Sequence, residues 1–140
     1  MNRQFEAVPA ERTKVPLLVG MTGASGSGKT YSALRLAVGM QKVTPGGIVF
    51  IDTESKRALH YAGDGMFKFD HVDFQPPFSS KDYIAVLEYA QSLNPAVIIV
   101  DSLSHEKEGP AGMLDFHEKE VDRLAGNDDF FSDAVFFSRP

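Results

Sequence analysis

The chain has 140 residues, of which 43% are hydrophobic and 24% are charged, which is the balance of one globular domain with a packed core. A formal net charge of −5 argues against a surface built throughout for nucleic acid, and the absence of cysteine excludes a disulfide framework and a thiolate metal site. The charged N-terminus lacks the apolar run of a signal peptide and no stretch is long enough to span a membrane, so we expect a cytoplasmic protein.

The first part of the chain carries the strongest motif. Residues 1–15 are polar and predict a loosely ordered lead-in to a domain at 16–140. An apolar run at 16–21 predicts a buried parallel strand, and residues 31–41 predict a helix. Between them, residues 23–30 read G-x-x-x-x-G-K-T, the phosphate-binding loop of the P-loop nucleotide hydrolases. Strand, loop and helix in this order are the context that the motif requires.

This glycine-rich loop (residues 23–30) predicts a site for nucleotide phosphates. Glycines let the backbone approach a phosphate closely, and the amides at the N-terminus of the following helix point at it. Lys29 would add a positive charge at the β- and γ-phosphates, and the Thr30 hydroxyl would bind Mg²⁺. The alternative is a glycine- and serine-rich turn with a solvated lysine. The predicted nucleotide-binding residues are Gly23, Ala24, Ser25, Gly26, Ser27, Gly28, Lys29, Thr30 and Tyr31.

Two strands are predicted next. Residues 48–52 form a short apolar run that leads into a short helix ending near Tyr61. Residues 66–74 mix phenylalanines with lysine, aspartate and histidine, which suits the edge of a sheet better than its centre.

The most apolar strand lies in the second half of the chain. A helix at about 81–93, capped by Ser79 or Ser80, precedes it. Residues 96–101 are continuously apolar up to an aspartate, as central parallel strands are. The remaining predicted elements are a polar loop at 102–112, a helix at 113–125 and a last strand at 134–138.

Strands that alternate with helices predict the fold class. The pattern is that of an α/β domain with three αβα layers around a mostly parallel sheet. The crossover connections should be right-handed. In such a sheet the carboxyl ends of the strands share one edge with the glycine-rich loop.

Three carboxylates are expected at that edge. Asp101 ends the most apolar strand and can face Thr30 across the phosphate site to hold Mg²⁺; the alternative is an aspartate that caps the next turn. Glu54 follows the strand at 48–52 and can orient a water and accept its proton, unless it is a surface glutamate at a helix start. Asp52 competes for this role, but its side chain can also point into neighbouring backbone.

The histidines give a weaker indication of a functional role. His105 and Glu106 follow Asp101 closely, which allows a γ-phosphate sensor or a partner contact, but a polar loop is the preferred interpretation. The other histidines have no second ligand at metal spacing, so we interpret them as structural or exposed.

Further stretches resemble one group of P-loop proteins. Residues 50–54, Phe-Ile-Asp-Thr-Glu, resemble the RecA-type strand that ends in a catalytic glutamate. Residues 97–102, Val-Ile-Ile-Val-Asp-Ser, resemble the RecA Walker B segment. The chain is most similar to phage-encoded RecA-core ATP-binding proteins in its Ser-Gly-Ser-Gly-Lys-Thr-Tyr-Ser-Ala-Leu run at 25–34, Pro-Pro-Phe at 76–78 and Asp-Ser-Leu-Ser-His-Glu at 101–106.

The resemblance covers about residues 16–125 and assigns roles by position. It implies phosphate contacts along the glycine-rich loop, Mg²⁺ at Thr30 and Asp101, and Glu54 as the catalytic base. It also implies that the last strand inserts between the Asp101 strand and the strand before the loop. The implied sheet order is 69–74, 48–52, 97–101, 134–138 and 17–21.

The chain departs from this family near its C-terminus. RecA-type proteins carry a polar sensor, often glutamine, after the strand that follows Walker B, and residues 138–140 contain no glutamine. The family core then continues with further strands and a DNA-binding loop, so we interpret the chain as truncated in its C-terminal part, or as having a diverged tail. These departures argue against DNA binding, assembly and fast turnover, and they affect the expected nucleotide binding less.

The resemblance implies ATP binding and Mg²⁺-dependent ATP hydrolysis, weak in the isolated chain and linked to phage DNA recombination or single-strand annealing. The expected partners are the nucleotide, a second copy of the chain, and single-stranded DNA or phage recombination proteins, although the acidic charge does not support the DNA. One alternative is a non-hydrolysing interaction module. Another is a small-molecule phosphotransferase, for which the basic residues after Asp101 are not clustered. No guanine-specific element is visible, which favours ATP.

Overall fold

The computed structural model describes residues 7, 9–10, 16–63 and 65–127, and the other positions, including the predicted last strand at 134–138, lie outside this part. None of the described helices combines the length and the apolar character that a membrane span needs. The elements in order are α1 (Lys29–Gln41), β1 (Ile48–Asp52), the 3₁₀ helix η1 (Arg57–Tyr61), β2 (Asp70–Asp73), α2 (Ser80–Ser92), β3 (Val97–Asp101), α3 (Ser104–Glu108) and α4 (Met113–Asn127).

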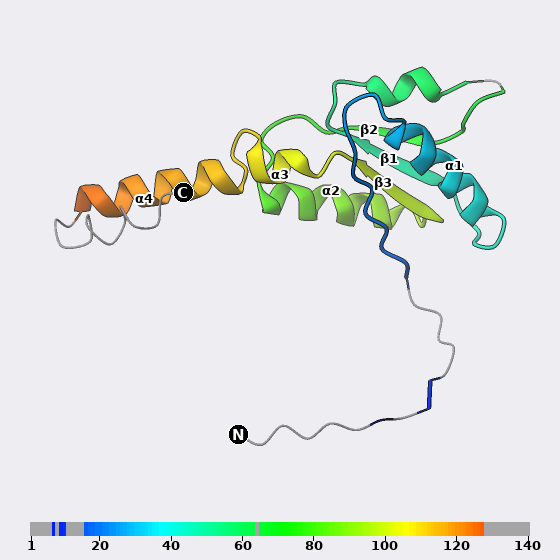
Figure 1. The fold of residues 1–140 in the computed structure, drawn as a ribbon, viewed down its shortest axis with the longest axis horizontal. Helices are drawn as coiled ribbons and strands as arrows, with labels where there is room; N and C mark the ends of the chain where they lie inside the picture. The colour runs from blue at the N-terminus through cyan, green and yellow to red at the C-terminus, as the bar shows by residue number, and fades with distance from the viewer. Residues whose placement is uncertain (1–6, 8, 11–15, 64, 128–140) are drawn as a thin grey trace.

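Three strands form a parallel sheet in the order β2-β1-β3 (Figure 1). Asp52, the last residue of β1, lies opposite Asp73 of β2 and Asp101 of β3. The carboxyl ends of all three strands therefore lie at the same level along one edge. This arrangement confirms the predicted α/β class, the edge position of β2 and the order of these three strands.

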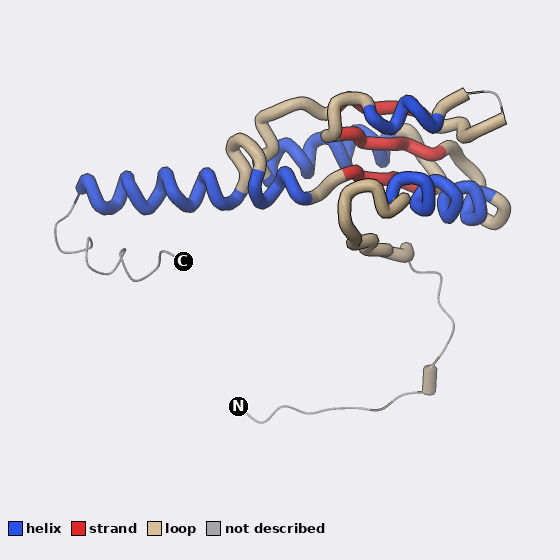
Figure 2. The backbone as a smooth tube through the Cα atoms, turned by 45° about the horizontal axis from the view of Figure 1, so that its top comes forward, coloured by secondary structure: helices blue, strands red, loops and turns tan. Residues whose placement is uncertain are grey.

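Helices cover both faces of the sheet (Figure 2). On one face, Leu34 of α1 packs in a buried cluster with Phe50 and Ile99. On the other face, Ile51 and Ala90 of α2 form a second buried cluster. Burying a side chain such as that of Phe50, which has no exposed surface, stabilises the fold by about 1.5–3 kcal/mol. Alternate residues of β1 thus face opposite helices, which gives three layers.

The predicted cap of α2 is confirmed. The Ser79 hydroxyl accepts a hydrogen bond from the Asp82 amide, and the Asp82 carboxylate accepts one from the Ser79 amide. This reciprocal pair is a capping box, which satisfies two amides at a helix start. Ser79, rather than Ser80, is therefore the cap residue.

The predicted strand at 16–21 is wrong for the described structure. Residues 16–24 form no strand, and the side chains of Leu17 and Leu18 are 70% and 98% exposed. A strand exists only where its backbone pairs with a neighbour. The neighbour that the resemblance implied, 134–138, lies outside the described residues, and β3, expected at the centre, lies at the edge of the described sheet.

The segment after β3 also differs from the prediction. Residues 102–112 were expected to be a polar loop, but they contain the helix α3. Glu106, Lys107 and Glu108 are good helix formers, and the helix ends where the Gly109 amide donates to the His105 carbonyl at 2.8 Å. α4 confirms the predicted helix, but it leads away from the sheet (Figure 1) and leaves apolar side chains exposed. These side chains are Met113, Leu114, Phe116 and Leu124.

Candidate functional site

The glycine-rich loop turns the chain tightly into α1. Gly26 and Gly28 have φ angles of 76° and 85°, in the left-handed region that glycine adopts without a steric penalty. Gly28 is the N-cap of α1 and has no side chain to occupy the amides of the first turn. These amides are therefore available to an anion, at the positive end of the helix dipole.

Lys29 and Thr30, the first residues of α1, point their functional groups at the loop and at β3. The Lys29 Nζ donates to the carbonyl oxygens of Gly23 at 2.7 Å and Ala24 at 2.9 Å, which holds the ammonium group over the loop. The Thr30 hydroxyl donates to the Asp101 carboxylate at 2.5 Å. The loop and the end of β3, 71 positions apart in the chain, thus meet at one point.

The donor set at this point fits a hard divalent cation. Thr30 and Asp101 offer a hydroxyl and a carboxylate oxygen, the ligand type that Mg²⁺ prefers. The described residues contain no group of three or more His, Cys, Asp or Glu side chains that could hold a metal. The two residues would therefore bind Mg²⁺ together with phosphate oxygens and water, which is how Mg²⁺ is usually held in phosphate sites. Their role as metal ligands stays a prediction.

The structure does not bring Glu54 to the glycine-rich loop. Its carboxylate lies 3.5 Å from the Arg57 guanidinium, one turn further along the chain. Glu54 is also absent from the residues that line the cavity beside the loop. Its role as a catalytic base therefore stays a prediction.

Asp52 points into neighbouring backbone, the alternative that the sequence left open. Its side chain is 1% exposed and accepts hydrogen bonds from the amides of Glu54 at 2.7 Å and Ala58 at 3.0 Å. His71 Nε2 lies 3.1 Å from the same carboxylate. Asp52 thus shapes the turn that carries Glu54. Its pairing with His71 could not be predicted from either segment alone, because it depends on how β1 and β2 pair in the sheet.

An aromatic surface lies beside the loop. Tyr31, predicted as part of the nucleotide site, has its ring centroid 5.4 Å from that of Phe67 in an edge-to-face arrangement and 6.2 Å from that of Tyr61. Tyr31 is half-exposed. Tyr61 and Phe67 were not predicted as site residues, since nothing in their spacing marks them.

A polar network lies directly behind Asp101. The Ser102 amide donates to the Thr53 hydroxyl at 2.8 Å, and His105 Nδ1 lies 3.0 Å from the same hydroxyl. The Tyr83 hydroxyl donates to the Ser102 carbonyl at 2.9 Å. Burial raises the pKa of the Tyr83 phenol, which keeps this donor protonated. Sequence reasoning missed Thr53 and Tyr83, and interpreted His105 as part of a loop.

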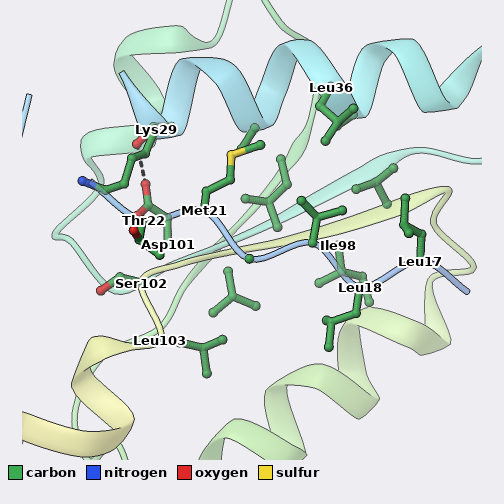
Figure 3. Close-up of a pocket in the computed structure, with 18 of the residues that line it drawn as sticks. Leu17, Leu18, Met21, Thr22, Lys29, Leu36, Ile98, Asp101, Ser102 and Leu103 are labelled. Carbon is green, nitrogen blue, oxygen red and sulfur yellow. Dashed lines mark hydrogen bonds between the residues drawn. The ribbon is translucent and has the colours of Figure 1, made fainter. Parts of the chain in front are cut away.

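A cavity of about 570 Å³ extends from this site along β3. Figure 3 shows Leu17 and Leu18 beside Ile98 at one end of the cavity, and Lys29 and Asp101 at the other. The apolar part of the cavity lies between β3 and the segment before the loop, where the resemblance implied one more strand. The polar part is the candidate phosphate site.

A scan of protein-family models and searches of curated proteins and of solved structures find no match to this chain. The functional assignment therefore depends on the motif and on the geometry of the site.

Proposed function

We propose that this chain binds Mg-ATP at residues 23–30 and hydrolyses it slowly, as a RecA-like P-loop domain. The observation that carries the proposal is the contact between Thr30 of the glycine-rich loop and Asp101 of β3 at 2.5 Å. A motif alone predicts a phosphate site, but a hydroxyl and a carboxylate that converge beside it from distant parts of the chain would also supply ligands for the metal ion that accompanies a triphosphate.

The charges and rings around the loop support a nucleotide as the ligand. The Lys29 ammonium and the first amides of α1 would bind phosphate oxygens, whose charge they complement. The half-exposed ring of Tyr31, supported by Phe67, offers an aromatic surface on which a base can stack. Bound Mg²⁺ would neutralise charge on the β- and γ-phosphates.

Hydrolysis would depend on Glu54. Released from Arg57, its carboxylate would orient a water and accept the proton as that water attacks the γ-phosphorus. The ion pair with Arg57 is an exposed one and competes only weakly with this role. We propose slow turnover because the RecA-type sites that the chain resembles take a cation from a neighbouring subunit, which the isolated chain does not have.

A second candidate is a nucleotide-binding module that does not hydrolyse ATP. The observation in its favour is that Glu54 pairs with Arg57 and is not among the residues that line the cavity beside the loop. A link to single-stranded DNA depends on the resemblance alone and gains no support from a net charge of −5.

Equilibrium binding of a fluorescent ATP analogue tests the binding proposal. We expect Lys29→Ala to weaken binding about 10- to 100-fold, since it removes a charge-assisted hydrogen bond worth about 1.5–3 kcal/mol. Lys42→Ala is the matched control, because Lys42 is an exposed lysine at the opposite end of α1. Equal binding by both variants would contradict the proposal.

Phosphate release separates the two candidates. If the chain is an ATPase, Glu54→Gln should lower the rate of phosphate release at least about 100-fold without preventing nucleotide binding. Tight binding with no release above background in the wild type would favour the non-hydrolysing module.

A further inference from the structure

Thr53 occupies the point where the ladder between β1 and β3 ends. The last paired residues are Asp52 and Asp101, so Thr53 and Ser102 are the first residues beyond the ladder. The Thr53 amide donates to the Asp101 carbonyl at 2.9 Å, and the Ser102 amide donates to the Thr53 hydroxyl at 2.8 Å. Thr53 therefore binds both the carbonyl and the amide of the peptide group between Asp101 and Ser102.

The hydroxyl of Thr53 is fixed from several sides. His105 Nδ1 lies 3.0 Å from it, and the His105 ring packs against Phe78 in a tilted arrangement with centroids 4.9 Å apart. The hydroxyl is also 3.3 Å from the Ser102 carbonyl, which accepts a further hydrogen bond from Tyr83. Thr53 is only 7% exposed, so these protein groups, rather than bulk water, determine where its hydroxyl points.

The same peptide determines where the Asp101 carboxylate can lie. An aspartate side chain has two rotatable bonds, so its carboxylate follows the backbone closely. At its outer end the carboxylate meets the Thr30 hydroxyl at 2.5 Å. Groups that orient a metal ligand without touching the metal change affinity or activity about 10- to 100-fold when they are lost.

We propose that Thr53 is a positioning residue for Asp101, and that its hydroxyl, held by His105, sets the Mg²⁺ affinity of the site. This inference rests on the proposed function, because it concerns the same carboxylate. The proposal differs from a merely structural role in one measurable way: the loss should appear in the dependence on Mg²⁺ and not only in the stability of the chain.

The test compares three variants of the full chain, at a temperature where all are folded, by titrating Mg²⁺ into a fixed amount of fluorescent ATP analogue. Thr53→Val keeps the shape of the side chain and removes its hydroxyl. We expect it to raise the Mg²⁺ concentration at half-saturation about 10-fold, while binding of the analogue in EDTA changes less than about twofold. Thr53→Ser keeps the hydroxyl and should behave like the wild type.

Ser79→Ala is the matched control, because it removes a part-buried hydroxyl that caps α2 and has no contact with Asp101. It should lower stability and leave the Mg²⁺ titration unchanged. Wild-type behaviour of Thr53→Val overturns the positioning role, as does an equal shift in Ser79→Ala or a loss in Thr53→Ser as large as that in Thr53→Val.

His105→Phe keeps the ring against Phe78 and removes the nitrogen, so it serves if Thr53→Val does not fold. The Mg²⁺ concentration at half-saturation should also rise in this variant, by a smaller factor than in Thr53→Val. An unchanged Mg²⁺ titration overturns the role of His105. If the wild type itself fails to bind the analogue, the proposed function fails and the inference fails with it. Wild-type binding with an unshifted Thr53→Val removes the inference alone.

Discussion

At the residue scale, the end of β1 divides its polar side chains between two tasks. Asp52 is buried, and its carboxylate accepts hydrogen bonds from two backbone amides and contacts the His71 ring. It therefore holds the turn that follows β1. Glu54, two residues later, is partly exposed, and within the described part of the chain its carboxylate pairs with Arg57. Of the two carboxylates that the sequence offered as a base, only Glu54 can move without breaking the fold.

Asp52→Ala should therefore destabilise the chain. The substitution leaves the buried amide of Ala58, the part-buried amide of Glu54 and one nitrogen of His71 without their acceptor, and we expect the free energy of unfolding to fall by about 3 kcal/mol. Equilibrium unfolding in urea measures this loss of free energy. Asp70→Ala, at an exposed position of β2, should change it by less than about 0.5 kcal/mol. Similar losses in both variants would show that the network contributes little.

At the element scale, periodicity and composition predicted α1, β1, α2, β3 and α4 because each of these carries its own local signal. Helical spacing, a serine cap and a continuous apolar run are properties of the segment itself. The segment before the loop has the same apolar character as β1, yet it forms no strand in the described structure. Pairing depends on a second segment, which no pattern within 16–21 can reveal.

The candidate site, like the fold, was predictable only where a residue belongs to a local motif. Thr30 and Asp101 belong to motifs, and parallel strands place their ends together, so their approach could be expected. Thr53, Tyr83 and His71 act through contacts between segments that are distant in the chain. Only the folded sheet, with α2 packed against it, brings these residues to their partners.

β3 is an edge strand of the described sheet, yet it is apolar along most of its length. In the described part of the chain it pairs only with β1, and the cavity runs along its other side. Edge strands are normally protected by charges or proline, but Val97 to Val100 are all apolar. The predicted occupant of this edge remains 134–138.

Introduced cysteines test this prediction in a chain that has none of its own. Ile98→Cys combined with cysteine at 135, 136 or 137 in turn should form a disulfide within one chain at alternating positions, because successive side chains of a strand point to opposite faces. Electrophoresis without reductant detects it. Cysteine at the exposed position of Leu59 is the control partner and should form none. Equal linkage at all three positions, or at none, would contradict a paired strand.

At the scale of the whole molecule, the parallel sheet creates the site by aligning its strand ends. Asp52, Asp73 and Asp101 lie at one level, and the glycine-rich loop meets the last of them through Thr30. A ligand that binds there would add a further link between α1 and β3, which already meet through Leu34 and Ile99 and through Thr30 and Asp101. Binding should therefore stabilise the whole fold and not only the loop.

Thermal unfolding with and without Mg²⁺ measures this effect. At an ATP concentration about 100-fold above the dissociation constant, the native state gains about 2.7 kcal/mol, which corresponds to a rise in Tm of about 5–10 °C for a chain of this size. In EDTA, ATP keeps the amides and Lys29 but loses the link through Thr30 and Asp101, so we expect a smaller rise. Asp101→Asn should show this smaller rise even with Mg²⁺ present, while Asp70→Asn, on the exposed edge strand, should retain the full increment. An equal rise in EDTA and in Mg²⁺ for the wild type would remove Thr30 and Asp101 as metal ligands and leave the loop as a simple anion site.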